Sequence, residues 1–242
     1  GKPMWPTGYA ESDDGIHWRK PDLGQVTFHG RPTNQIRPDW KIGGYVPSLL
    51  HSAFENPSPD ALPSQRFGGD WSEVVVLPSG RKARRRFAWS PDGIRWTPAD
   101  LPNELQRAHF DVSQILCMPD ADDPGSRVIA FAQVTRSRGW DGRVVRQIGA
   151  MRGPSLEKIK DPGDPVLLAP ESGIDEELHF ASVSRVGNTL LMLFESDRFA
   201  RNPIHGDLRL AISTDGRHFR RVHPRDAVVS TGAKGVWDEN LL

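Results

Sequence analysis

The stretch ESDDGIHWRKP, residues 11–21, returns as WSPDGIRWTPA at residues 89–99 and as ISTDGRHFRRV at residues 212–222. The three copies share the pattern Ser-x-Asp-Gly-x-x-aromatic. A phrase repeated at wide spacing indicates a repeated supersecondary unit. Asp-Gly favours a tight turn, because Gly adopts positive φ without penalty and Asp bonds to nearby backbone. Each copy therefore predicts a β-hairpin whose aromatic ring pins the turn.

The spacing of the copies predicts propeller blades. Ser12, Ser90 and Ser213 are 78 and 123 positions apart, and half of the second interval, about 61, predicts a hidden copy near residue 152. A degraded copy lies there, in QIGAMRGPSLEKIKDP (147–162), with Arg152-Gly153-Pro154 at the turn and Ile159 in the place of the ring. A repeat of about 61–78 residues suits a four-stranded blade with long loops.

Composition favours an all-β chain without charged partners. Among 242 residues there are 23 Gly and 21 Pro but few long helical patterns, which is typical of turn-rich β structure. Lys plus Arg equals Asp plus Glu, 31 each, so no overall field attracts nucleic acid or membrane. The chain shows no signal peptide or transmembrane stretch. An extracytoplasmic or a cytoplasmic location stays open, and so does the oligomeric state.

The predicted fold class is all-β, a five-bladed β-propeller that is incomplete in this chain. We expect one domain over residues 1–242. Its first blade is partial and its last only begins; the expected segments are 5–20, 43–96, 110–160, 177–222 and 236–242. LEKIK, residues 156–160, is expected to be the outer strand of the third. Pro/Gly/Asp-rich linkers separate the blades. Alternatively, the two chain ends could complete one blade together.

Three acids recur at the start of successive inner strands. Asp111, Glu177 and Asp238 are 66 and 61 positions apart, so they would converge around the propeller axis. Convergent carboxylates suit glycosidic bond cleavage, in which one acid protonates the leaving oxygen and another is base or nucleophile. The alternative is that such acids cap backbone amides at loop-to-strand junctions. Gly43 breaks the pattern in the second blade, and the assignment at Glu177 could shift to its acidic neighbours.

Other side chains near the inner strands are candidates for substrate binding. They comprise imidazoles that could line the channel and indoles that could stack on sugar rings, namely His109, His179, Trp237 and Trp40. No HxH, HExxH or zinc-type Cys spacing occurs, so we predict no metal ligands and no cofactor. Hard oxygen ligands at the axis would nevertheless accommodate a structural Ca²⁺.

These residues resemble the five-bladed propeller glycoside hydrolases related to families 32, 43 and 68. The likeness rests on AESDDGIHWRKPDLGQVTFHG, FDVSQILC, LRLAISTDGRHFRRV and GVWDENLL, and it is closest to a poorly characterised bacterial branch with "DG-HW-KP-LG" and "G-WD" phrases. The resemblance implies a funnel-shaped carbohydrate site at the axis. It implies an O-glycosyl hydrolase with a carbohydrate substrate.

The resemblance assigns roles to some of the acids. The characterised families use one inner-strand acid from each of the first three blades, but the first inner strand is absent here and the second position is Gly43. Glu177 is our preferred general acid and Asp111 our preferred base or nucleophile. Asp238 would orient the substrate or tune the pKa of a neighbour by like-charge proximity.

Two other functions compete with a glycosidase. A carbohydrate-binding propeller that has lost catalysis is favoured by Gly43 and the partial first blade. A sialidase-like enzyme is favoured by the turn phrase, which is similar to the sialidase Asp-box. That box has one more residue between Asp and Gly, and such enzymes need an arginine triad and a Tyr nucleophile. Only Tyr9 and Tyr45 are available, so this hypothesis ranks third.

Overall fold

The computed structural model shows two compact units, Gly1–Arg107 and Ala108–Leu242, and each is described by itself. The residues that the structure describes are 6–41, 46–47, 49–56, 58, 60–77, 80–101, 112–118, 125–138, 144–160, 166–169, 176–198, 205–223 and 226–230. Their secondary structure is β-strand apart from two 3-10 turns, η1 (Pro63–Gln65) and η2 (Leu156–Lys158). No helix in this part of the chain is long and apolar enough to cross a membrane.

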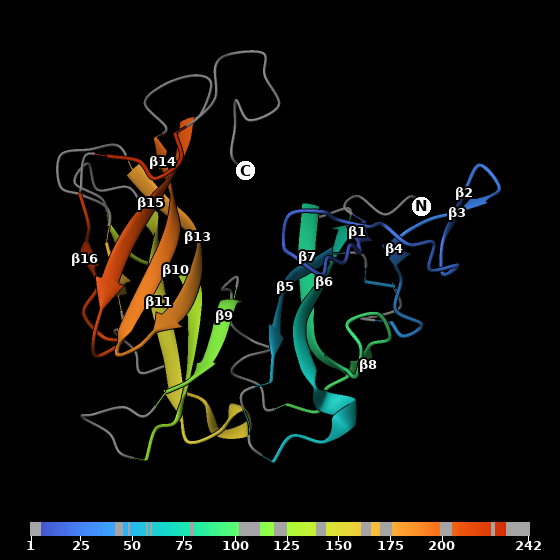
Figure 1. Ribbon diagram of the computed structural model, residues 1–242, viewed down its shortest axis with the longest axis horizontal. Coiled ribbons are helices and arrows are strands. Elements are labelled where there is room, and N and C mark those ends of the chain that lie inside the picture. The colour runs from blue at the N-terminus through green and yellow to red at the C-terminus, as the bar shows by residue number, and fades with distance from the viewer. Residues whose placement is uncertain are drawn as a thin grey trace. The chain divides into compact units, whose positions relative to one another are not determined.

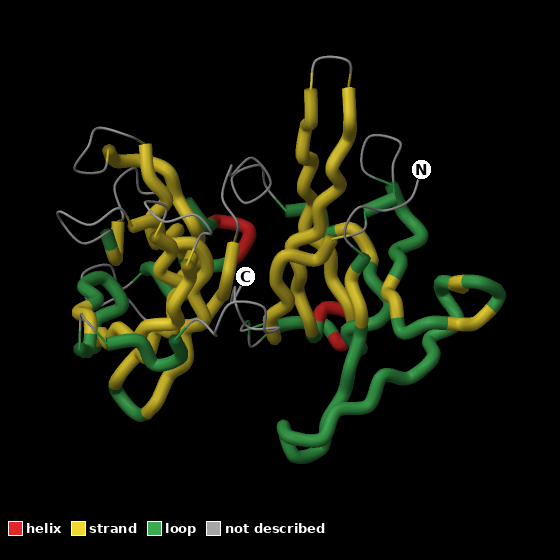
Figure 2. The backbone as a smooth tube through the Cα atoms, turned by 90° about the horizontal axis from the view of Figure 1, so that it is seen from above, coloured by secondary structure: helices red, strands yellow, loops and turns green. Residues whose placement is uncertain are grey.

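The described residues of the first unit form one four-stranded antiparallel sheet, which Figures 1 and 2 show. Its order is β5-β6-β7-β8, with the bounds Leu49–Glu55, Phe67–Leu77, Gly80–Ser90 and Thr97–Pro98. Beside it, β1 (Thr7–Gly8) pairs with β4 (Gln35–Ile36), and β2 (Thr27–Phe28) pairs with β3 (Arg31–Pro32). Sequential antiparallel order is that of a propeller blade.

Tryptophan rings fill the core of the first unit. Trp71 is fully buried and Trp96 is 4% exposed, and their centroids lie 5.7 Å apart in a T-shaped contact. Trp40 makes a second T-shaped contact with Trp71 at 6.5 Å. Such edge-to-face pairs stabilise beyond their buried area. A Cβ at Gly69 would come within 2.7 Å of Trp96, which explains why the strand carries Gly there.

The second unit contains two four-stranded antiparallel sheets. One comprises β9 (Val112–Cys117), β10 (Val128–Arg138), β11 (Val144–Gly153) and β12 (Val166–Leu168). The other comprises β13 (Glu176–Val186), β14 (Thr189–Arg198), β15 (His205–Ser213) and β16 (Arg220–Arg221). Buried residues of both sheets form one core, which includes Phe131, Ile148, Leu178, Met192 and Phe194.

The outer strand of the third predicted blade lies elsewhere than expected. Residues 156–158 form the 3-10 turn η2, and the strand that pairs with β11 is β12, at Val166–Leu168, inside the predicted linker. The prediction of a strand over LEKIK is wrong. Only Lys160 of this stretch pairs with β11, in an isolated bridge to Arg152, because the 3-10 turn η2 occupies the preceding residues.

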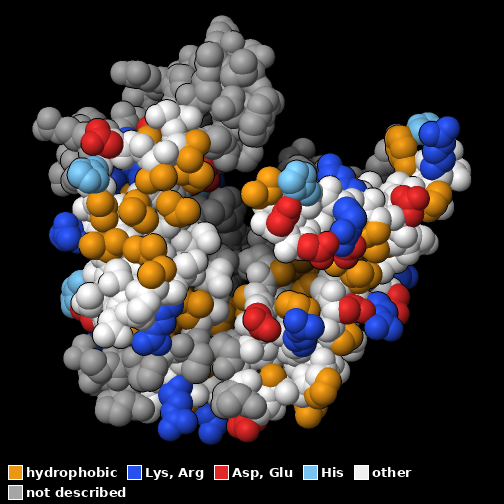
Figure 3. Space-filling view, in the orientation of Figure 1, with side chains coloured by type: hydrophobic (Ala, Val, Ile, Leu, Met, Phe, Trp, Pro, Cys, Tyr) orange, Lys and Arg blue, Asp and Glu red, His pale blue; other side chains and the backbone are white. Residues whose placement is uncertain are grey.

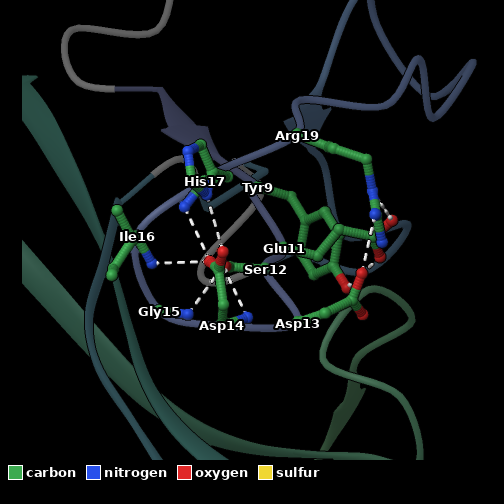
Figure 4. Close-up of polar contacts among 9 residues, drawn as sticks. All are labelled: Tyr9, Glu11, Ser12, Asp13, Asp14, Gly15, Ile16, His17 and Arg19. Atoms are coloured by element: carbon green, nitrogen blue, oxygen red, sulfur yellow. Dashed lines mark hydrogen bonds and ion pairs between the residues drawn. The ribbon is translucent and has the colours of Figure 1, made fainter.

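The repeated phrase folds as predicted, into a turn closed by local hydrogen bonds (Figure 4). In the first copy, Ser12 Oγ accepts the N–H of Gly15 at 2.8 Å. Asp14 Oδ1 accepts the N–H groups of Ile16 and His17 at 2.8 and 2.7 Å. The other two copies repeat these bonds. The glycine has φ near +75° in each copy, which only Gly adopts without strain.

All four copies close with the same register, including the degraded one. Antiparallel partners eight positions apart flank each turn, at Glu11↔Arg19, Trp89↔Thr97, Arg152↔Lys160 and Ile212↔Arg220. Ile159 is 3% exposed and precedes its bridge residue just as Trp96 and Phe219 precede theirs. The degraded copy therefore keeps the geometry of the turn without its Ser-x-Asp-Gly residues. That the whole chain forms one propeller domain stays a prediction.

One face of the β13–β16 sheet remains hydrophobic and accessible. Along β14, Leu190, Met192 and Phe194 are buried in the core, whereas Leu193, on the opposite face, is 40% exposed. Because residues alternate between the faces of a strand, the second face carries Leu191 and Leu193 of β14 beside the partly exposed Leu208, Leu210 and Ile212 of β15. Figure 3 shows hydrophobic side chains gathered over this sheet.

Candidate active site

Two carboxyl groups, those of Glu195 and Asp197, lie on the same face of β14. Glu195 and Asp197 are two positions apart, so the strand places both on the face opposite the core. Glu195 is 4% exposed and Asp197 is fully buried. A buried carboxylate needs a partner, because transfer of a charge out of water is costly. Two buried carboxyl groups at the end of β14 are therefore unusual on a face that otherwise carries leucines.

A β-bulge on the neighbouring strand brings His179 to these carboxylates. The register Glu177↔Asp197 and Leu178↔Ser196 shifts before Ala181↔Phe194, which inserts one extra residue in β13. Bulges re-aim side chains and are frequent beside active sites. His179, in the bulge, places Nε2 3.0 Å from Oδ2 of Asp197.

Arg146 and Glu177 complete the cluster. Nη1 of Arg146, on β11, lies 3.3 Å from Oε2 of Glu177 and 2.6 Å from Nε2 of His179. The Glu177 carboxylate is 3.7 Å from the same His179 nitrogen. The side chain of Glu177 is 21% exposed and that of Arg146 is 40% exposed, so solvent and small molecules reach this edge. We name Arg146, Glu177, His179, Glu195 and Asp197 the carboxylate cluster.

Burial shifts the acidity of one member. Burial, and to a smaller extent the negative charge of Asp197, raises the pKa of Glu195 to about 7, while His179 acts in the opposite direction. Two carboxylates in one low-dielectric site cannot both ionise readily. Glu195 therefore retains a proton up to about neutral pH.

Glu176, next to Glu177, has a different role. It points to the opposite face, where it is 3% exposed and pairs with Arg221 through two contacts of 3.0 and 2.8 Å. Ser196 Oγ donates to the same carboxylate. This bidentate pair fixes β16 against the inner strand. Of the adjacent acids, Glu177 is thus the one available for chemistry.

The structure brings together two of the residues that the sequence proposed for the site. Glu177 and His179 are neighbours in the carboxylate cluster. Trp40, proposed as a sugar platform, is half-buried and donates its Nε1–H to the Trp96 carbonyl at 2.9 Å. Its sugar contact stays a prediction. The others lie outside the described residues, and their roles stay predictions: Asp111, Asp238, His109 and Trp237.

Sequence reasoning missed Arg146, Glu195 and Asp197. The stretch LLMLFESDR (190–198) carries a signal, because two acids two positions apart at the end of an apolar strand must share a face. The predicted acids were confined to the starts of inner strands, whereas these two occupy a second strand. No local signal identifies Arg146, which meets Glu177 through tertiary structure.

Tyr9, one of two tyrosines that a sialidase-like site could use, is poorly prepared as a nucleophile. Burial raises its pKa, and its hydroxyl donates to Oε2 of Glu11 at 3.2 Å, which raises the pKa further. An activated tyrosine would need the opposite change, since the phenolate is the nucleophile. Tyr45 lies outside the described residues.

Comparison with solved structures finds proteins of similar fold. No family model matches the chain, and no curated protein matches it. A structure described as "Glycoside hydrolase" matches with a TM-score of 0.58 and 14% identity, over 93% of this chain and 66% of its own. An N-acetylgalactosamine deacetylase from F. plautii, in complex with blood group B trisaccharide, matches with a TM-score of 0.56 and 18% sequence identity. The match covers 98% of this chain and 66% of the deacetylase chain.

A third structure, described as an RGII complex of BT0996, matches with a TM-score of 0.56 and 14% sequence identity. The match covers 90% of this chain and 64% of the BT0996 chain. The chain thus spans about two thirds of the length of these three structures. At such identities the likeness establishes the fold. The predicted all-β propeller class is confirmed, and the resemblance to propeller glycoside hydrolases holds for the fold.

Proposed function

We propose that the protein is a glycoside hydrolase that cleaves an oligo- or polysaccharide. The observation that carries the proposal is the carboxylate cluster, in which Glu177 of β13 is partly exposed and lies beside an arginine and a histidine. The fold, which a glycoside hydrolase and a deacetylase solved with a trisaccharide share, is consistent with a carbohydrate substrate.

Glu177 is the general acid in this proposal. Its carboxyl group would donate a proton to the glycosidic oxygen as the bond to the sugar carbon breaks. Exposure decides between the acids, because the Glu177 side chain is 21% exposed whereas Glu195 and Asp197 are buried. Arg146, 3.3 Å from Oε2, orients the carboxyl group, and His179 contacts either that group or a sugar hydroxyl.

The second catalytic group is proposed to be Asp111, as base or nucleophile, with Asp238 orienting the substrate. His109, Trp237 and Trp40 would bind sugar rings and hydroxyls. If the carboxyl groups of Glu177 and Asp111 lie about 5–5.5 Å apart, the anomeric configuration is retained; a separation of about 6.5–9.5 Å gives inversion.

The test is hydrolysis of a panel of aryl glycosides and plant oligosaccharides by the full chain and matched variants. Glu177→Gln and Asp111→Asn should each lower kcat by about 10²–10⁴-fold. Glu157→Gln, an exposed residue of η2, serves as the control and should retain full turnover. Circular dichroism verifies that every variant is folded.

Two results would overturn the proposal. Turnover that survives both substitutions would exclude these acids. No turnover on any substrate, together with saturable sugar binding that is indifferent to the substitutions, would instead support a non-catalytic carbohydrate-binding propeller.

A further inference from the structure

Two buried carboxyl groups in the carboxylate cluster lack the hydrogen-bond partners that burial requires. Within the described part of the chain, no hydrogen bond reaches Oε1 of Glu195 or either side-chain oxygen of Asp197. Asp197 is fully buried and Glu195 is 4% exposed. Buried charges in proteins are paired or coordinate metals, and each unsatisfied polar atom requires an explanation. The contact of Asp197 with His179 at 3.0 Å offsets only part of this cost.

The geometry around these atoms fits a cation. His179, Glu195 and Asp197 each offer one ligand atom, and these atoms lie within 4.8 Å of one another. Ligands about 2.0–2.2 Å from a common ion are separated by about 3–4 Å, so a small inward movement would complete a three-residue site. Bidentate or water ligands would fill the remaining positions.

Space for an ion beside Glu195 and Asp197 depends on the absence of a side chain at Gly206. A methyl group there would lie 2.6 Å from Oδ1 of Asp197 and 3.2 Å from Oε1 of Glu195. No side chain other than hydrogen fits against both carboxylates. The strand β15 therefore approaches the pair with bare backbone, as is usual where backbone meets a ligand.

The Nε2 atom of the His179 imidazole contacts two different groups. It contacts Nη1 of Arg146 at 2.6 Å and Oδ2 of Asp197 at 3.0 Å. This nitrogen has one lone pair in the plane of the ring, so it can accept from Arg146 or ligate a cation, but not both. A cation held between Nε2 and the Asp197 oxygen would displace Arg146 from the imidazole, and Arg146 would retain its contact with Glu177.

We propose that His179, Glu195 and Asp197 bind a divalent transition-metal ion of the Mn²⁺ or Zn²⁺ class. An imidazole with two carboxylates suits these ions, whereas Ca²⁺ takes six to eight oxygen ligands. Two carboxylate charges balance the ion. All three ligands belong to the carboxylate cluster, and the Nε2 atom of His179 lies 3.7 Å from Oε2 of Glu177. Metal binding at these three residues can nevertheless be tested without glycoside hydrolysis.

Metal content and stability test the site without an activity assay. The full chain is dialysed against a chelator, and then Mn²⁺, Zn²⁺ or Ca²⁺ is added alone. We expect about one Mn²⁺ or Zn²⁺ per chain by elemental analysis. At about 100 times Kd, the Tm should rise by on the order of 5 °C. Ca²⁺ should have a much smaller effect.

Matched variants assign the ligands. His179→Ala and Glu195→Gln should each weaken binding by about 100-fold or more in calorimetric titrations. His17→Ala and Glu157→Gln remove the same side-chain types from exposed positions and should bind as the wild type does. If a ligand variant does not fold, the spectrum of the Co²⁺-substituted wild type decides, because nitrogen and carboxylate ligation gives visible d–d bands that differ from those of aqueous Co²⁺.

Three outcomes overturn the proposal. The first is a folded chain that takes up neither Mn²⁺ nor Zn²⁺ and whose Tm does not respond, which would mean that Glu195 and Asp197 share a proton instead. The second is a response to Ca²⁺ equal to that to Mn²⁺ or Zn²⁺. The third is undiminished binding by both ligand variants, or an aqueous-type Co²⁺ spectrum.

Discussion

Replacing Asp92 by Ala should destabilise the first unit through the turn that supports Trp96. Oδ1 of Asp92 accepts the backbone N–H groups of Ile94 and Arg95 at 2.9 and 2.8 Å. Loss of a capping carboxylate costs about 0.5–2 kcal/mol. The side chain is only 31% exposed, and the turn carries an indole that is 4% exposed. We therefore expect the upper end, about 2 kcal/mol. The ion pair with the exposed Arg95 adds little.

The dependence on pH provides an independent measure of the same bonds. Burial would raise the pKa of Asp92, but the backbone N–H groups of Arg95 and Ile94 and the Arg95 side chain outweigh it and lower the pKa to about 2. A carboxyl whose pKa is lower in the folded state stabilises fully above the unfolded value, about 4, and loses its effect as the pH falls through the folded value. The difference between wild type and Asp92→Ala should therefore shrink between about pH 4 and pH 2.

Urea denaturation followed by tryptophan fluorescence measures the effect, because Trp71 and Trp96 lie in this unit. Asp92→Asn is the informative control: its amide oxygen still accepts both N–H groups, so we expect it to retain roughly half of the lost stability. Asp14→Ala should cost less than Asp92→Ala, since Trp18 is 60% exposed. An unfolding free energy of Asp92→Ala within about 0.5 kcal/mol of wild type at pH 7 would refute the reasoning.

Three further substitutions test other parts of the structure. Arg221→Met leaves the buried Glu176 carboxylate without its bidentate partner and should cost about 3 kcal/mol; an unchanged Tm would contradict this. Gly206→Ala places a methyl group 2.6 Å from Asp197 and should cost about 1–3 kcal/mol in urea denaturation, and it should also abolish metal uptake; wild-type uptake would refute the clash. Trp96→Ala should cost about 3–5 kcal/mol by the same denaturation measurement, and a loss below about 1 kcal/mol would argue against the tryptophan core.

The sequence predicted the blades because the turn phrase is local. The Ser and Asp side-chain bonds within the turn join residues two or three positions apart, so the local residue types predict it. The outer strand β12 was not foreseen, since its pairing with β11 depends on a loop whose length no local pattern sets. The degraded copy at 152–160 was found by spacing, and its register agrees with the other three.

The candidate site was predictable only in part. Glu177 and His179 follow from their place at the start of an inner strand. Glu195 and Asp197 follow from strand alternation, once β14 is assigned, but their proximity to His179 depends on a bulge that the sequence does not mark. The contact of Arg146 with Glu177 joins residues of two sheets, and its distance in the chain puts it beyond pattern reasoning.

The turns also bear on how the protein ages chemically. Asp-Gly bonds are prone to succinimide formation, in which the glycine nitrogen attacks the aspartate side-chain carbon and water is lost. Here the Gly93 N–H is held by Ser90 Oγ at 2.8 Å, and Asp92 Oδ1 is held by two further backbone N–H groups. Nucleophile and electrophile are both restrained, so isoaspartate should accumulate slowly in folded molecules and quickly in unfolded ones. Peptide mapping of isoaspartate at residues 14, 92 and 215 would thus record which turns had opened during storage.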